Sequence, residues 1–187
     1  MQQREQLDSF LAGIQQRAFR IALASLAQRE DALDAVQDAM CKLVEKYCHK
    51  PAGEWAPLFY RILYSRITDI QRRRSSRGKV FGTLFFAGAE DRDGQPDPIA
   101  QVADASNPDP ARYSGDGEFG EALQQALRSM PERQRQAFLL RAWEGLDVAQ
   151  TARAMGCSAG SVKTHYSRAR QFLQRELEGF SDASVNA

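Results

Sequence analysis

The sequence predicts an all-α protein built from two small helical domains that a flexible acidic linker joins. Apolar residues recur at helical spacing in both flanks of the 187-residue chain, and no stretch alternates with the two-residue period of a strand. The helix-breaking glycines and prolines gather in the middle instead. We therefore expect one domain over residues 1–77, the linker over 78–118, a second domain over 119–180 and a disordered tail over 181–187.

The first domain begins with a periodic, helical stretch from Phe10 to Leu26. Asp31 offers an N-cap for a second helix that ends near Tyr47, with Asp34 in its first turn, where the helix dipole favours a carboxylate. A loop from Lys50 to Trp55 follows. Pro57 suits the start of a third helix that ends near Arg74.

The second domain has the order of a helix-turn-helix protein. A short helix covers 119–128, and Ser129-Met-Pro-Glu132 has capping-box spacing for a helix to Trp143, which Glu144-Gly145 breaks. The next helix covers 147–155 and stops at Gly156, and Ser158 caps a last helix that ends near Glu178. A short helix, a glycine turn and a longer helix form the helix-turn-helix arrangement.

The formal net charge of +1 hides a segregation of charge along the chain. Residues 1–77 carry 13 Lys and Arg against 9 Asp and Glu, residues 119–187 carry 9 against 7, and residues 78–118 carry 3 against 8. Two basic flanks remain compatible with nucleic-acid binding. No apolar run approaches the roughly 18 residues of a membrane span, so we expect a cytoplasmic protein without membrane insertion.

The last helix has one apolar and one polar face. Its apolar face is expected to hold Val162, Tyr166, Ala169, Leu173 and Leu177. Small residues in the first turns of the other face would let the helix enter a major groove, and longer basic residues would reach phosphates. A solvated basic face would give the same pattern, and the preceding helix and turn favour DNA.

The two later helices of the first domain also have distinct outward faces. The helix near residue 40 packs through Val36, Met40, Leu43 and Tyr47, joined by Leu33 and Val44, and turns carboxylates outward, which on its own indicates only a solvated face. The following helix combines Arg61, Tyr64 and Arg72 on its outer side, as single-stranded nucleic acid requires. Arg66 points into the apolar side, so we expect it to pair with a carboxylate or extend to solvent.

Three segments carry a resemblance to a known family. Residues 127–173, with Met130-Pro131, Glu144-Gly145 and Ser161-Val162-Lys163, resemble region 4 of the sigma-70 family of bacterial transcription initiation factors, in its extracytoplasmic-function (ECF) group. The stretch "DALDAVQDAM" resembles region 2.2, and "LFYRILYSRITDIQRRR" resembles regions 2.3 and 2.4. Together with the linker between them, these segments resemble an ECF factor over most of the chain.

The resemblance implies a non-enzymatic factor, without cofactor or metal, that binds core RNA polymerase and directs initiation at promoters with −35 and −10 elements. Its implied partners are the β′ clamp helices and β flap of polymerase, promoter DNA and an anti-sigma factor. The implied polymerase-binding residues are Asp34, Gln37, Asp38 and Cys41. Those for the −10 element and melting are Lys50, Trp55, Arg61, Tyr64, Ser65, Thr68, Arg72 and Arg73. Those for the −35 element are Ser158, Gly160, Ser161, Lys163, Thr164, Ser167 and Arg168.

The chain departs from the family pattern at several positions. Gln150-Thr151-Ala152 replaces the usual Glu-Ile-Ala, Leu58 stands where Trp is frequent, and Ser65 replaces a frequent Asn that contacts DNA. An altered preference at the −10 element is the expected consequence of Ser65.

Two alternative functions remain open on the sequence. One is a conventional regulator that uses only the helix-turn-helix. The other is a thiol or metal site at Cys41, Cys48 and His49. It is disfavoured because seven helical residues separate the cysteine Cα atoms by about 10.5 Å, beyond disulfide reach, and no further ligands follow at zinc-finger spacing.

Overall fold

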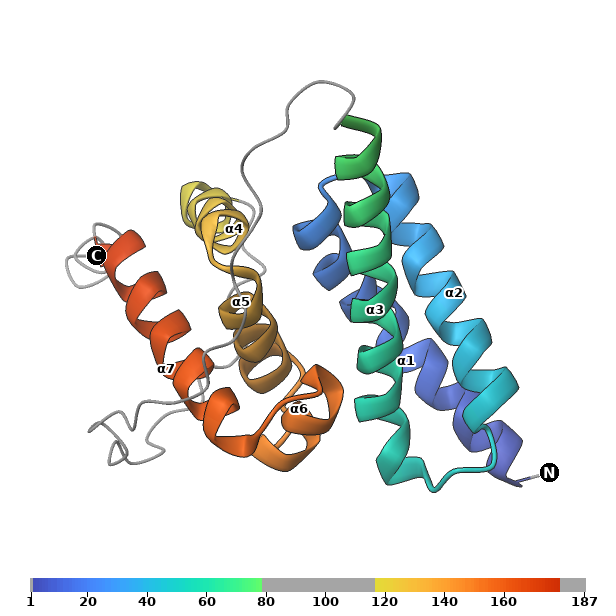
Figure 1. Ribbon diagram of the computed structural model, residues 1–187. Coiled ribbons are helices and arrows are strands. Elements are labelled where there is room, and N and C mark those ends of the chain that lie inside the picture. The colour runs from blue at the N-terminus through green and yellow to red at the C-terminus, as the bar shows by residue number, and fades with distance from the viewer. Residues whose placement is uncertain (1, 79–116, 179–187) are drawn as a thin grey trace.

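The computed structural model describes residues 2–78 and 117–178, and these residues are helical with no strand among them (Figure 1). The expected all-α class is therefore confirmed. Nearly all of the expected linker, and the expected tail, lie outside the described residues. The residues expected to form the first domain contain α1 (Gln2–Leu26), α2 (Arg29–Tyr47) and α3 (Ala52–Gly78). Those expected to form the second contain α4 (Glu118–Ser129), α5 (Glu132–Phe138), the π-helix η2 (Leu139–Trp143), α6 (Val148–Met155) and α7 (Ala159–Glu176).

The first domain packs α2 against both α1 and α3. Its buried alanines, Ala32, Ala35 and Ala39, give α2 a narrow surface that lets neighbouring helices approach closely. The larger side chains come from the other helices, where the Phe10 ring centroid lies 5.8 Å from that of Trp55 and 6.5 Å from that of Phe59. Edge and tilted contacts of this kind are favoured between aromatic rings, so this cluster anchors α1 to the start of α3.

Two predicted helix starts in the first domain are wrong. Helix α2 begins at Arg29 with Gln28 as N-cap, and Asp31 lies in its first turn, where it pairs with Arg74 of α3 instead of capping. Helix α3 begins at Ala52, so the residues expected to form the end of a loop are already helical, and Pro57 lies inside the helix. Starting α3 earlier brings Trp55 into the core, where 1% of it is exposed.

The local signals of the second domain are mostly confirmed. Asp147 and Gln150 form a capping box at the start of α6, and Gly156 ends α6 in the left-handed region with φ 65°. Ser158 caps α7 by accepting a hydrogen bond from the Ser161 N–H. The capping box expected at Ser129 is wrong, because its hydroxyl donates back to carbonyl oxygens of α4 and Pro131 occupies the N-cap of α5.

The two domains pack against each other. Helix α3 lies along α6, and α1 contacts α4, so the second domain covers one side of the first (Figure 1). Among the described helices, none combines the length and the apolar character that a membrane crossing requires.

Candidate functional site

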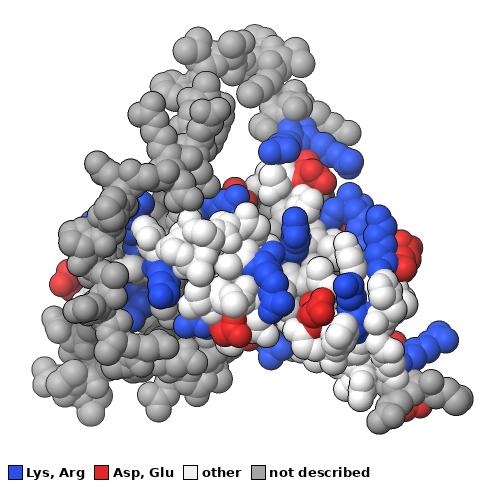
Figure 2. All heavy atoms as spheres, turned by 60° about the horizontal axis from the view of Figure 1, so that its bottom comes forward, with Lys and Arg blue, Asp and Glu red and all other residues white. Residues whose placement is uncertain are grey.

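The face of α7 opposite its packed side is open. On the packed side of α7, Val162 and Ala169 are fully buried and Leu173 is 7% exposed. The exposed predicted −35 residues on α7 are Gly160, Lys163, Ser167 and Arg168, and Ser161 and Thr164 are half-buried. Lys and Arg side chains spread over the face that carries α6 and the start of α7, with Asp and Glu between them (Figure 2). This arrangement leaves small residues in the first turns of α7 and basic residues around them.

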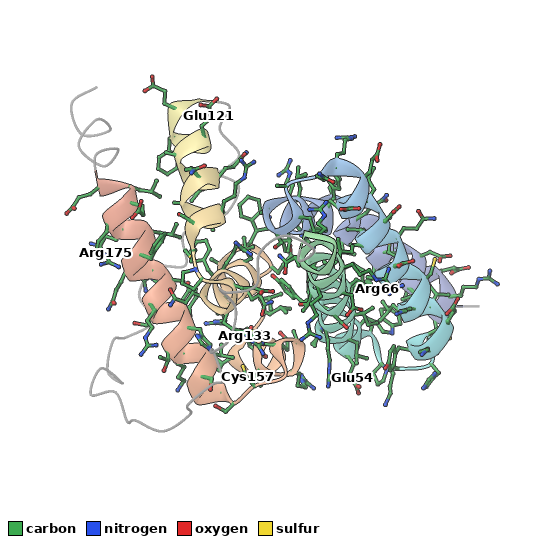
Figure 3. The ribbon with its side chains drawn as sticks, turned by 45° about the horizontal axis from the view of Figure 1, so that its top comes forward. Glu54, Arg66, Glu121, Arg133, Cys157 and Arg175 are labelled. Carbon is green, nitrogen blue, oxygen red and sulfur yellow. The ribbon has the colours of Figure 1, made fainter. Side chains whose placement is uncertain are left out.

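Hydrogen bonds hold the start of α7 in place. The Ser158 hydroxyl lies 3.0 Å from the Ser161 N–H and 2.9 Å from the Ser161 hydroxyl. An Arg133 guanidinium N–H donates to the Met155 carbonyl at the end of α6 over 2.9 Å, close to the turn that carries Cys157 (Figure 3). A cation that binds terminal carbonyls stabilises a helix end. The turn before α7 is thus fixed from both sides.

The underside of α7 is fixed by aromatic contacts. The Tyr166 ring stacks on Phe138 at a centroid distance of 6.3 Å, and the Arg141 guanidinium lies 5.7 Å from the Tyr166 centroid. Arg141 also donates to the Leu146 carbonyl over 2.6 Å. Phe138 is the last residue of α5 and Arg141 lies in η2. Because both contact Tyr166, they set the orientation of α7, and of its exposed face, relative to α5 and η2.

The outward face of α2 is acidic and partly apolar. All four predicted polymerase-binding residues, Asp34, Gln37, Asp38 and Cys41, are exposed. Leu33 and Val44, which we expected to be packed, are 45% and 42% exposed on the same face. That prediction is wrong because the neighbouring alanines, which the pattern missed, fill the core contacts instead. Leu33 and Val44 stand eleven residues apart on the helix, so each is a single exposed apolar side chain in a face that is otherwise polar and acidic.

Arg66 lies between α3 and α2 (Figure 3). Its guanidinium Nη2 is 2.5 Å from the Asp38 carboxylate, which confirms the expected pairing with a carboxylate. Asp38 is therefore tied to α3, while Asp34 has no ion pair among those the structure describes. The pair joins the acidic face of α2 to the helix that carries the predicted −10 residues.

The outer side of α3 is only partly open. Arg61, Ser65, Arg72 and Arg73 are exposed, Lys50 and Thr68 are half-buried, and the Thr68 hydroxyl donates to the Tyr64 carbonyl over 2.9 Å. Tyr64, expected beside Arg61 on an outward face, is instead 6% exposed because the second domain covers it. Trp55, expected in a base-capturing loop, is a core residue, so neither ring can meet a base in this arrangement.

Where the second domain packs against the first, it brings together residues that the sequence did not mark as a site. Arg17 Nε of α1 lies 3.3 Å from the Glu144 carboxylate, whose side chain is 2% exposed. Burial raises the pKa of Glu144, while Tyr60 and Arg17 act to lower it. Burial likewise raises the pKa of Tyr60 and of Tyr64. No local pattern marks such a cluster, because its members come from helices far apart in the chain.

Arg135 is the other buried charge at this interface. It is 7% exposed and donates to the carbonyl oxygens of Leu127 and Arg128 at the end of α4, over 3.2 and 3.4 Å. Burial lowers its pKa, and the nearby Tyr64 and Glu132 act in the opposite direction. Arg135 therefore stabilises the C-terminus of α4 and contributes a positive charge beside Tyr64.

Within residues 2–78 and 117–178, no three His, Cys, Asp or Glu side chains gather so as to hold a metal ion. Cys41, Cys48 and Cys157 form no disulfide in the described part of the chain.

The fold and its surfaces define a helix-turn-helix protein with a second helical domain that bears an acidic, partly apolar face. The family described as "Sigma-70, region 4" matches residues 120–173. ECF RNA polymerase sigma factor SigM of Mycobacterium tuberculosis is 32% identical over 173 residues, which cover 89% of this chain and 74% of SigM. ECF RNA polymerase sigma factor SigE of Mycolicibacterium smegmatis is 27% identical over 171 residues, covering 91% of this chain and 61% of SigE.

A solved structure shares the fold. The sigma factor RpoE of Bartonella quintana, solved in complex with the anti-sigma factor NepR, matches with a TM-score of 0.63 and 22% identity, over 91% of this chain and 96% of that one. The chain described above belongs to the ECF group of sigma-70 family RNA polymerase sigma factors.

Proposed function

We propose that this chain binds core RNA polymerase and directs it to promoters by recognising −35 and −10 elements and helping to melt the DNA. The observation that carries the proposal is the face of α2, where all four predicted polymerase-binding residues, Asp34, Gln37, Asp38 and Cys41, are exposed. A regulator that acts only through its helix-turn-helix has no need of this second protein-binding surface. Family membership supports the same function.

Each surface takes one role in the proposal. The face of α2 docks on the β′ clamp helices, and the second domain docks on the β flap. The open face of α7 enters the major groove of the −35 element, with Gly160, Ser161 and Thr164 toward the bases and Lys163 and Arg168 toward phosphates. The outer side of α3 holds the −10 strand through Arg61, Ser65 and Arg72.

An anti-sigma factor is the second proposed partner. The similar fold of RpoE was solved with the anti-sigma factor NepR bound. The polymerase partnership places the proposed site of action in the cytoplasm, and polymerase itself supplies the catalytic chemistry. A pull-down with the full chain as bait, followed by mass spectrometry, is expected to recover both polymerase and an anti-sigma factor. Recovery of polymerase alone would remove the anti-sigma factor from the proposal.

The experiment that tests the function combines core RNA polymerase, the purified chain and DNA of its own genome, followed by sequencing of bound DNA and transcripts. Asp34→Arg should abolish polymerase binding, because it reverses the charge on the exposed face of α2. Asp8→Arg, the same charge change on the exposed side of α1, is its control. Arg168→Ala should lose promoter-specific transcripts and keep polymerase binding, whereas Arg175→Ala, farther along α7, should keep both.

The outcome also separates the two classes of DNA-binding protein. A sigma factor requires both surfaces, so Asp34→Arg and Arg168→Ala must each abolish specific transcription. If the chain binds specific DNA without polymerase and Asp34→Arg changes nothing, the conventional regulator is the correct assignment.

A further inference from the structure

We infer that Arg66 of α3 is a positioning residue for polymerase binding: it holds the Asp38 carboxylate on the face of α2 and leaves neighbouring Asp34 as the carboxylate that meets a cation of polymerase. The inference rests on the proposed function, since it concerns the face that the proposal docks on the β′ clamp helices. Arg66 is not among the residues that the resemblance implies for this docking, because it lies on α3 and not on α2.

Two ion pairs cross the crevice between α2 and α3. Arg74 pairs with Asp31 in the first turn of α2, and Arg66 pairs with Asp38 two helical turns farther along. Asp34 lies between them on α2 and lines the same crevice. Of the three carboxylates that α2 places along this crevice, Asp34 is therefore the one without an ion pair among the residues that the structure describes.

The contact between Arg66 and Asp38 joins one atom of each side chain. Arg66 Nη2 donates to Asp38 Oδ2 over 2.5 Å, and the Asp38 side chain forms no second hydrogen bond within the described residues. Because 52% of the Asp38 side chain is exposed, its other carboxylate oxygen can accept a hydrogen bond from a docked protein. A side chain already held in one orientation loses less conformational entropy on binding, so the pair prepares Asp38 for its partner.

The same pair is poorly suited to stabilise the fold. An ion pair that is largely open to water adds little to the free energy of unfolding, because solvent screens both charges. Arg66 Nε is moreover buried and has no hydrogen-bond partner within the described residues, and such an unsatisfied group is unfavourable. The effect of Arg66 is therefore expected in the affinity for polymerase and not in stability.

The pair also makes the two predicted contact carboxylates different from each other. Asp34 and Asp38 are four residues apart, so they lie one turn apart on the same face of α2, and both are exposed. Arg66 compensates the charge of Asp38, whereas Asp34 keeps its full negative charge. A cation of polymerase is therefore expected at Asp34, and an uncharged hydrogen-bond donor suits Asp38.

The test measures binding of the full, fluorescently labelled chain to core RNA polymerase. Arg66→Met keeps the apolar stem and removes the cation, so binding should weaken about tenfold. Arg66→Lys keeps a cation that can reach one carboxylate oxygen and removes the buried Nε, so it should bind within about twofold of the wild type. Arg4→Met makes the same change as Arg66→Met at an exposed position of α1 and should leave binding unchanged.

A double-mutant cycle shows whether Arg66 acts through Asp38. If it does, adding Arg66→Met to Asp38→Asn should weaken binding by no more than about twofold beyond Asp38→Asn alone. Urea denaturation of Arg66→Met should give the wild-type midpoint. A tenfold loss that persists in the Asp38→Asn background, or one that Arg66→Lys does not restore, would overturn the positioning role.

The salt dependence of binding tests the division between the two carboxylates. Asp34→Asn should reduce that dependence more than Asp38→Asn, because Asp34 carries the uncompensated charge. An equal reduction in the two variants would overturn this part of the inference.

The same titrations separate failure of this inference from failure of the proposed function. If the wild-type chain does not bind core polymerase, the proposed function is wrong, and the inference falls with it. If the wild type binds and Asp34→Arg abolishes binding, but Arg66→Met binds as the wild type does, the proposed function stands and the inference alone is overturned.

Discussion

Glu144 titrates inside the interface between the two domains, so the stability of the closed form, in which the domains pack together, depends on pH. Its carboxyl faces Arg17 of α1 and Tyr60 of α3, with Tyr64 beside them, and burial raises its pKa above the ordinary 4.5. The closed state then binds a proton more tightly than the open or unfolded state. The contribution of Glu144 to the stability of the closed form is fully present below the ordinary pKa of a glutamate and is lost as pH rises through the raised pKa of Glu144. Thermal midpoints measured across this window should fall with rising pH.

Glu144→Gln should make the thermal midpoint independent of pH over that window, because glutamine does not titrate and has nearly the same shape as glutamate. Arg17→Ala should extend the dependence to higher pH, since the arginine acts to lower the pKa of Glu144. Arg4→Ala is the control. A wild-type profile that rises with pH over the same window would contradict the assignment to Glu144.

Trp55 is predicted to stabilise the first domain. It is 1% exposed and packs on Phe10, so Trp55→Ala should lower the free energy of unfolding by about 3–5 kcal/mol, measured by urea denaturation. Its indole N–H has no hydrogen-bond partner among the described residues, so Trp55→Phe removes volume without breaking such a bond. Trp55→Phe should therefore cost clearly less. If Trp55→Ala kept full stability but lost promoter melting, Trp55 would be a DNA-binding residue and not a core residue.

Thr151 stands where the family usually has isoleucine, and it is fully buried in α6. Its hydroxyl lacks a hydrogen-bond partner within the described part of the chain. Thr151→Val keeps the shape and removes a buried unsatisfied group, so it should raise the free energy of unfolding by about 1–2 kcal/mol. Thr151→Ser, which keeps the hydroxyl and loses the methyl, should instead destabilise. Equal denaturation midpoints for wild type and Thr151→Val would mean that the hydroxyl is satisfied in solution.

At the scale of elements, the turn between α6 and α7 depends on one glycine. Gly156 has φ 65°, and a Cβ added there would meet no atom within 4 Å. Gly156→Ala should therefore cost about 1 kcal/mol through backbone strain alone. Gly160 lies inside α7, where an added Cβ makes only ordinary contact with the Ser158 hydroxyl oxygen at 3.7 Å. Gly160→Ala should stabilise α7 by up to about 1 kcal/mol, and chemical denaturation of both variants checks the opposite signs.

Element boundaries could be predicted where the signal is local. Gly156 and Ser158 each act on their own helix end, and both fulfil the predicted roles. The start of α2 could not be predicted in the same way, because Asp31 is engaged by Arg74 from another helix. Leu33 was misplaced for a related reason. Periodicity finds an apolar stripe, but the alanines that actually contact α1 and α3 give only a weak signal.

At the scale of the whole molecule, the sequence predicted the surfaces but not their accessibility. Arg61 and Tyr64 lie on the side of α3 that the helical period assigns to them, and the open face of α7 also agrees. The sequence could not show that the second domain covers Tyr64, because the contacts between the domains join Arg17 to Glu144 and α3 to α6. Neither contact leaves a periodic pattern. Domain closure is decided by tertiary packing of buried polar groups, which local propensity does not describe.

The accessibility of Tyr64 should report the state of the whole molecule. In the closed chain it is 6% exposed, so hydroxyl-radical footprinting with mass spectrometry should modify it slowly. Tyr47, half-buried at the end of α2 and outside the interface, provides an internal reference. Arg17→Glu, which breaks the ion pair with Glu144, should increase the Tyr64 rate relative to Tyr47. Core RNA polymerase added without DNA should do the same, because its docking must separate the domains before α3 can hold a strand. A Tyr64 rate that stays low in the polymerase complex and then in the complex with melted DNA would show that the ring never stacks on a base, and closure would then serve stability alone.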